Sequence, residues 1–162
     1  MRRRHVLPSL SALLGLCAMP GCGAGECTLV GCGGEKTSVV VLGPNWSALE
    51  PAVHTLDVEL GETTFRVTCD IAALRCEPVE NLSGNLEINV FVSGQGQITI
   101  DVGSEFNTGA DLPDGYTVTV TRDGNVVTED EGSFEFEESR PNGPDCSPVC
   151  RTTDGAFVFV EP

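Results

Sequence analysis

Positive charge is scarce in this sequence of 162 residues, which has nine lysines and arginines against 24 aspartates and glutamates. The only lysine is Lys36, and three of the arginines are Arg2, Arg3 and Arg4. After the first 21 residues, six basic residues face all 24 acidic ones, a net charge near −18. Such a surface repels nucleic-acid phosphates and anionic lipid headgroups, so a DNA- or RNA-binding role is excluded.

Catalytic motifs are also lacking. The sequence has no G-x-S-x-G elbow, no H-E-x-x-H motif and no glycine-rich phosphate loop. Apart from His5, the only histidine is His54, which lies at a strand start and is expected to be structural or merely exposed. We therefore assign no catalytic residue, expect no cofactor, and predict that the protein is not an enzyme.

Long apolar runs are missing after residue 22, and the one run before it is short. Val6 to Met19 spans about 14 residues, whereas a membrane-spanning helix needs about 20. The run follows the arginines Arg2 to Arg4 and leads into Pro20-Gly21-Cys22. A basic start, a short apolar run and a small residue are typical of an export signal, so we predict a signal peptide at residues 1–21.

The end of this signal resembles the lipobox of bacterial lipoproteins, in which a cysteine directly after the cleavage site receives lipid. Gly21 matches the small residue before the cut, and Cys22 matches the lipidated residue. The family usually has leucine where this sequence has Met19, and Pro20 is an unusual neighbour. The resemblance implies an exported protein anchored to the bacterial cell envelope, on its periplasmic or surface face, through the lipid alone. Ordinary secretion, with cleavage near Ala24, is the alternative.

The remaining composition is typical of an all-β chain. Valine and threonine are abundant, and 19 glycines and 10 prolines gather in turn-like clusters. We predict a glycine- and cysteine-rich tether at 22–36 and, at 37–162, a single antiparallel β-sandwich of about 8–10 short strands, stapled by disulfides. The predicted strands are 37–42, 53–60, 63–69, 76–79, 85–92, 97–102, 116–121, 126–128, 133–138 and 156–160.

Two tight hairpins support this architecture. Gly61-Glu62 separates two alternating strands, and Asp123-Gly124 supplies the positive φ angles that a two-residue hairpin turn requires. The segment Leu112–Val120 resembles the "LPxGxYTVTV" strand of bacterial immunoglobulin-like and transthyretin-like sandwiches, although it lacks the residue between Gly115 and Tyr116. The resemblance implies the same sandwich fold.

Six cysteines remain when Cys17 and Cys22 are set aside, and in an exported chain they predict three disulfides. Cys69 ends one strand and Cys76 begins the next, so we predict a bond between them. The other four either pair locally at each end or cross-link the two ends of the domain. Cross-linking closes the larger loop and stabilises by about 4–5 kcal/mol against about 2 for a local bond, which favours it. These four are Cys27, Cys32, Cys146 and Cys150. Their spacings do not fit a zinc site.

Two groups of carboxylates raise the question of calcium, which takes about six to eight oxygen ligands. One group lies in and around the long loop, at Asp101, Glu105, Asp111 and Asp114. The other lies at Glu129, Asp130, Glu131, Glu135, Glu137 and Glu138. No D-x-D-x-D-G motif is present. We therefore interpret both groups as solvated strand and loop faces, with the first as a weak calcium candidate.

Together these features predict an exported, membrane-anchored lipoprotein that acts as a non-enzymatic structural or binding module at the cell envelope. Its partner, a protein or a glycan, is not specified by the sequence. Sandwiches bind through end loops and sheet edges, so Gly103–Gly115 and Arg140–Cys150 are the expected binding regions. The alternatives are a small carboxylate-based hydrolase and a calcium-dependent adhesion module.

Overall fold

The structure is a computed structural model that describes residues 36–84, 86–104, 112–145 and 149–161. The predicted signal peptide, the tether up to residue 35 and the residues Cys22, Cys27, Cys32 and Cys146 lie outside these ranges. Lys36, which was expected to end the tether, is instead the first residue of a strand.

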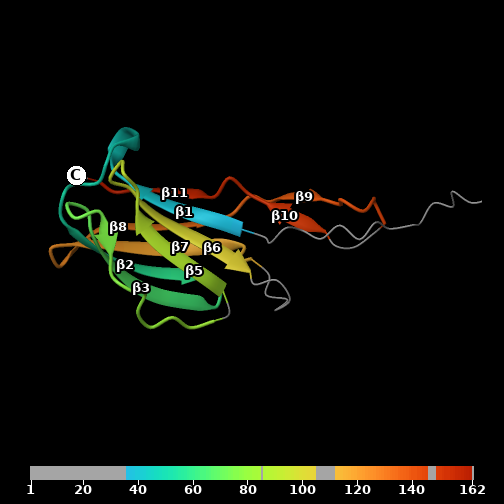
Figure 1. The fold of residues 1–162 in the computed structure, drawn as a ribbon, viewed down its shortest axis with the longest axis horizontal. Coiled ribbons are helices and arrows are strands. Elements are labelled where there is room, and N and C mark those ends of the chain that lie inside the picture. The colour runs from blue at the N-terminus through green and yellow to red at the C-terminus, as the bar shows by residue number, and fades with distance from the viewer. Residues whose placement is uncertain (1–35, 85, 105–111, 146–148, 162) are drawn as a thin grey trace, which may run out of the picture.

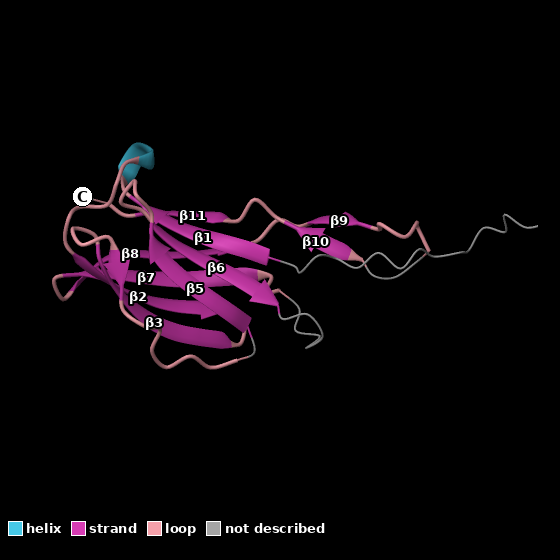
Figure 2. Ribbon diagram, in the orientation of Figure 1, coloured by secondary structure: helices cyan, strands magenta, loops and turns pink. Residues whose placement is uncertain are grey.

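The described residues form an all-β fold in which two sheets pack face to face (Figures 1 and 2). Sheet A has the order β11-β1-β6-β5, and sheet B has the order β4-β3-β2-β7-β8. The strands of sheet A are β1 (Lys36–Leu42), β5 (Leu86–Val92), β6 (Ile98–Ser104) and β11 (Ala156–Phe159). Those of sheet B are β2 (Val53–Leu60), β3 (Thr63–Asp70), β4 (Arg75–Cys76), β7 (Gly115–Arg122) and β8 (Asn125–Ser133).

A small ribbon extends from one end of the sandwich (Figure 1). It pairs β9 (Glu137–Ser139) with β10 (Cys150–Thr152). Among the described residues, the one helical element is a 3-10 turn, η1 (Pro44–Trp46), between β1 and β2. Over the described ranges, no helix has the length and apolar character that crossing a bilayer requires.

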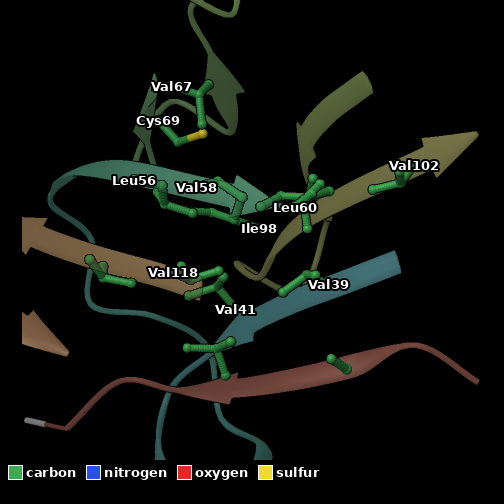
Figure 3. Close-up of a cluster of buried hydrophobic side chains, with 14 of the residues drawn as sticks. Val39, Val41, Leu56, Val58, Leu60, Val67, Cys69, Ile98, Val102 and Val118 are labelled. Atoms are coloured by element: carbon green, nitrogen blue, oxygen red, sulfur yellow. The ribbon is translucent and has the colours of Figure 1, made fainter. Parts of the chain in front are cut away.

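The core lies between the two sheets, because most of the long strands have apolar residues at alternate positions and turn them inward. In β2, for example, Leu56, Val58 and Leu60 are buried while Asp57 and Glu59 point outward. Val39 and Val41 of β1 meet them from the opposite sheet (Figure 3). Burying one such side chain stabilises the fold by about 1.5–3 kcal/mol, so this alternation is what holds the sheets together.

Both hairpin predictions are confirmed. Leu60 pairs with Thr63 across Gly61-Glu62. Arg122 pairs with Asn125 across Asp123-Gly124. At that second turn φ is 51° for Asp123 and 81° for Gly124. Two consecutive positive φ angles match the right-handed twist of the flanking strands, which explains why this dipeptide closes the hairpin. The register that it sets shifts between Val120 and Thr121, where β8 has one extra residue.

The segment after this turn was predicted incorrectly. Instead of separate strands at 126–128 and 133–138, one strand, β8, runs through the acidic residues 129–131 and ends at Ser133. It stays paired with β7 because Glu129 and Glu131 face outward on the strand and are solvated. In this part of β8, pairing with β7 depends on side chains pointing alternately to the two faces of the sheet, and not on apolar side chains. β9 overlaps the predicted strand 133–138 only at its end, and β10 was not predicted because it has no alternating apolar pattern.

One strand pairing departs from the expected antiparallel pattern. β11, the last described strand, lies parallel to β1, the first, and Leu42 is in register with Phe159. The other pairings between described strands are antiparallel. This arrangement places the C-terminal strand at the edge of sheet A, beside the segment that leaves β1 (Figure 1).

The predicted disulfide between Cys69 and Cys76 is confirmed, and the two residues are direct partners across β3 and β4 with Cα atoms 4.0 Å apart. Cys150 is also disulfide-bonded, and its partner lies outside the described residues. The choice between local and cross-linked pairing of the other cysteines therefore stays a prediction.

Replacing Cys69 and Cys76 together by alanine should lower the free energy of unfolding by about 2 kcal/mol, because the unfolded chain regains the entropy of a short closed loop. Urea denaturation of the wild type and the double variant measures this difference. Gln95→Ala in the exposed turn before β6 serves as the control, with an expected change below about 0.5 kcal/mol. A double variant as stable as this control would contradict the prediction.

Candidate binding surface around Trp46

Trp46, the single tryptophan of the sequence, lies in η1 in an unusual backbone conformation. The φ angle is 53° at Asn45 and 66° at Trp46. Asparagine tolerates this left-handed region, but a bulky tryptophan adopts it only at a cost of about 1–3 kcal/mol. The turn is closed by backbone hydrogen bonds, in which Gly43 N–H donates to the Ser47 carbonyl at 3.0 Å and Ser47 N–H to the Pro44 carbonyl at 3.2 Å.

This conformation places the indole against two phenylalanines from β11. The ring centroids of Trp46 and Phe157 are 4.9 Å apart, and those of Trp46 and Phe159 are 5.3 Å apart, both in edge-to-face geometry. Phe157 and Phe159 point outward because Ala156 and Val158 occupy the inward positions of the same strand. We call Trp46, Phe157 and Phe159 the aromatic cluster.

The aromatic cluster is exposed to solvent. The exposed fraction is 61% for Trp46, 42% for Phe157 and 41% for Phe159. Val40 of β1, which pairs with Phe157, is half-buried beside them. A contiguous apolar surface that is exposed at a cost in backbone strain is typical of a site that contacts a partner.

A groove of about 700 Å³ begins at Phe157 and runs towards the β9–β10 ribbon. Tyr116 and Phe136 line it together with three exposed carboxylates, those of Glu135, Glu137 and Asp154. None of the described residues that line it is basic. The groove therefore adds an acidic, partly aromatic surface next to the aromatic cluster.

The ring of Tyr116 is fixed by its neighbours. Its hydroxyl donates to Asp130 Oδ2 at 3.0 Å, and its ring centroid is 5.4 Å from that of Phe134. Burial, assisted by the bond to Asp130, raises the pKa of Tyr116 to about 12. Tyr116 therefore stays protonated at neutral pH and acts in the groove as an aromatic wall.

Arg151 also joins the β9–β10 ribbon to the sandwich. Its guanidinium lies over the ring of Phe136, 3.9 Å from the centroid, and its Nη2 donates to Asp114 Oδ1 at 2.6 Å. Asp114 is one of the weak calcium candidates, and in the structure its carboxylate forms this ion pair.

The four calcium candidates are only partly described. Asp101 lies on the outward face of β6 in sheet A, whereas Asp114 immediately precedes β7 in sheet B. Glu105 and Asp111 lie outside the described residues. Over the described ranges no three histidine, cysteine or carboxylate side chains gather as a metal site would require.

The second acidic group is divided between two places. Glu129 and Glu131 are exposed on β8, in agreement with a solvated strand face, while Asp130 accepts the hydrogen bond from Tyr116. Glu135 and Glu137 line the groove. Of the two predicted binding loops, residues 105–111 and 146–148 lie outside the described ranges.

Sequence reasoning missed the aromatic cluster. The sequence predicted a loop or a single helical turn at 46–51 and an ordinary final strand at 156–160. One feature of the sequence could have indicated it. Phe157 and Phe159 alternate with Ala156 and Val158, so the two phenylalanines share one face of the strand. What no local pattern shows is that β11 lies beside β1, which brings residues 46 and 157 together.

Comparison with protein-family models, with curated proteins and with solved structures finds no match for this chain. The lipobox and the immunoglobulin-like or transthyretin-like strand therefore remain resemblances, carried by Cys22 and the segment Leu112–Val120.

His54 is structural rather than exposed, and it lies at the same end of the sandwich as η1. Its side chain is fully buried on the inward face of β2, in phase with Leu56. Its Nδ1 lies 3.2 Å from the Ala52 carbonyl oxygen, which can only accept, so Nδ1 carries the proton. Burial lowers the pKa of His54 from its ordinary 6.5, although the bond to Ala52 opposes this shift. The ring is therefore neutral at neutral pH.

Acidification should weaken the fold through His54. As pH falls below about 6.5, the unfolded chain binds a proton at this residue more readily than the folded chain, whose His54 pKa is lower, so stability is lost. Urea denaturation at about pH 7.5 and about pH 5 measures the loss. His54→Asn, which does not titrate there, should show a smaller pH dependence, since the carboxylate contribution is common to both proteins. Equal pH dependence in the two proteins would contradict the prediction.

Proposed function

We propose that this protein is an exported, lipid-anchored and non-enzymatic binding module of the bacterial cell envelope, which engages its partner through the aromatic cluster. The export and anchoring parts rest on the basic start, the short apolar run and Gly21-Cys22. The binding part rests on one observation above the others, namely that the sole tryptophan is held exposed in a left-handed backbone conformation.

The frame around the aromatic cluster supports this role. β11 and β1 are rigid strands of sheet A, and two backbone hydrogen bonds close the turn that carries Trp46. A partner would therefore bind a preformed surface, and little binding free energy would be lost in ordering that surface. Exposed tryptophans contribute more binding energy than most other residues, because a large apolar ring leaves water on contact. The partner is a protein or a glycan.

The groove supplies the one observation that favours a second function. Glu135, Glu137 and Asp154 line it, and paired carboxylates are the catalytic groups of glycoside hydrolases. A small carboxylate-based hydrolase would lose turnover in Glu135→Gln or Glu137→Gln and keep it in Trp46→Ala. The calcium-dependent adhesion module finds less support, because Asp114 already pairs with Arg151.

Trp46→Ala should lower retention of the purified protein on envelope fractions and immobilised glycans by about 30-fold, the loss expected for a binding hot spot of about 2 kcal/mol. The fold should remain, with a stability loss no greater than about 2 kcal/mol, because only edge contacts to two phenylalanines disappear.

Phe91→Ala is the matched control, since Phe91 is a 40% exposed aromatic residue on β5, at the opposite edge of sheet A. It should leave retention unchanged. Equal loss in both variants, or no loss in Trp46→Ala, would refute the assignment of the aromatic cluster as the binding surface.

Lipid attachment is tested separately from binding. Cells grown with a palmitate analogue should label the wild-type protein, and Cys22→Ala should abolish the label because Cys22 is the residue that matches the lipidated cysteine. Cys17→Ala is the control and should label like the wild type. Absence of label in the wild type, or equal label in Cys22→Ala, would exclude the lipid anchor while leaving the binding proposal open.

A further inference from the structure

β11 forms one edge of sheet A, beside the aromatic cluster (Figure 1). It pairs with β1 on one side only, and Val160 N–H donates to the Leu42 carbonyl of β1 at 2.8 Å. Successive residues of a strand direct their backbone groups alternately to its two sides, so Val158 faces β1 as Val160 does. The N–H and C=O groups of Phe157 and Phe159 therefore face away from β1, towards the free side of the sheet.

This edge is partly covered at Phe159 and open at Phe157. Thr128 Oγ1 of β8 donates to the Phe159 carbonyl at 3.5 Å. No backbone or side-chain group of the described residues forms such a bond with the edge-facing N–H or C=O of Phe157. The groove of about 700 Å³ begins at this residue. An extended chain lying in the groove could therefore pair with the backbone of Phe157.

The edge of β11 also lacks the usual protection against pairing with another chain. Native sheets commonly place charged side chains on their edge strands. β8, an edge of sheet B, exposes Glu129 and Glu131, and β5, the other edge of sheet A, exposes Glu87. The four residues of β11, Ala156–Phe159, include no charged side chain. An unprotected edge with exposed aromatic side chains is typical of a strand that accepts a strand from a partner.

The charge of the groove indicates what kind of chain would bind. Three exposed carboxylates line the groove, and none of its described lining residues is basic. Arg151 of the β9–β10 ribbon is already paired with Asp114. A second copy of this protein, with a net charge near −18 after the first 21 residues, would be repelled. A glycan has no backbone amides with which to continue a sheet. The complementary occupant is a positively charged peptide segment.

We propose that an extended, positively charged segment of a partner protein adds to sheet A beside β11 and pairs with the backbone of Phe157. Its lysine or arginine side chains lie in the groove against Glu135, Glu137 and Asp154. Since strand side chains alternate, apolar residues between the basic ones lie beside Phe157, on the same face as the aromatic cluster. Main-chain hydrogen bonds supply affinity in this mode, and side chains supply specificity. The inference rests on the proposed binding function and names the kind of partner.

Amide hydrogen exchange, followed by NMR on the purified wild-type protein, tests the pairing directly. The Phe157 amide should exchange rapidly in the free protein, whereas the Val158 amide, which faces β1, should be protected. The probe is a peptide of about six residues, the usual length of a strand, in which lysine and valine alternate. At saturation it should slow exchange at Phe157 at least about tenfold and leave Val158 unchanged.

Four results would overturn the proposal. Protection of the Phe157 amide before peptide is added would mean that another part of this chain already pairs with the edge. Protection that appears only as protein concentration rises, with a dimer in light scattering, would assign the edge to a second copy. Failure of the saturating peptide to slow Phe157 would remove the added strand. Equal slowing by a peptide of alternating glutamate and valine would remove the requirement for positive charge.

Non-specific attraction to an acidic protein is separated from strand pairing by N-methylation. Two isomers of the lysine–valine peptide are methylated at alternate amides, one at the lysines and the other at the valines, so their charges are equal. Only one set of amides can face β11, so one isomer should bind at least about tenfold more weakly than the other. Equal affinities would show that charge alone holds the peptide, which contradicts the proposal.

The groove is tested with Glu135→Gln and Glu137→Gln combined in one variant. It should bind the lysine–valine peptide about fivefold more weakly, because two exposed carboxylates beside the bound lysines are lost. The matched control combines Glu62→Gln and Glu87→Gln, which change the net charge equally at exposed residues outside the groove. It should bind like the wild type, and an equal loss in both variants would refute the groove as the site.

Failure of this inference can be told apart from failure of the proposed function. If Trp46→Ala lowers retention on envelope fractions while the peptide leaves Phe157 unchanged, the aromatic cluster binds a partner and only the added strand is wrong. If the peptide protects Phe157 while Trp46→Ala has no effect on retention, the strand edge stands and the assignment of Trp46 as the hot spot is wrong.

Discussion

Burial of one apolar face from each sheet is the interaction on which the rest of this structure depends. Val39 and Val41 from sheet A meet Leu56 and Val58 from sheet B, and none of them is exposed by more than a few per cent. Since strand side chains alternate, fixing these residues inward fixes their neighbours outward. Phe157 and Phe159 are exposed for this reason, and Trp46 lies against them.

Features that depend on neighbours in sequence could be predicted, and features that depend on distant pairing could not. The Asp123-Gly124 turn and the Cys69–Cys76 bond are local, so the residues themselves contain the information. The aromatic cluster depends on β11 joining β1, which no local pattern indicates. The burial of His54 could be predicted only in part. His54 belongs to the same alternate positions of β2 as Leu56, Val58 and Leu60, which favours an inward side chain. Histidine at a strand start is nevertheless ordinarily exposed.

The two ends of the sandwich serve different purposes in this interpretation. At one end, the 43–50 loop holds Trp46 against Phe157 and Phe159 of β11. At the other, Arg151 joins the β9–β10 ribbon to the strands through Phe136 and Asp114. The backbone strain at Trp46 is maintained only because Pro44, Ser47 and β11 surround it with fixed partners.

The parallel pairing of β1 and β11 also constrains the order in which the strands of sheet A can assemble. A chain delivered across a membrane from its N-terminus would present β1 early and β11 last, so sheet A could not acquire its final edge until nearly the whole domain had emerged. Contacts so distant along the chain form slowly, and one backbone edge of β1 would stay unpaired in the meantime. Residues 156–159 would then be the last to join sheet A, and a product truncated before them would leave β1 as an unpaired edge that is prone to aggregation.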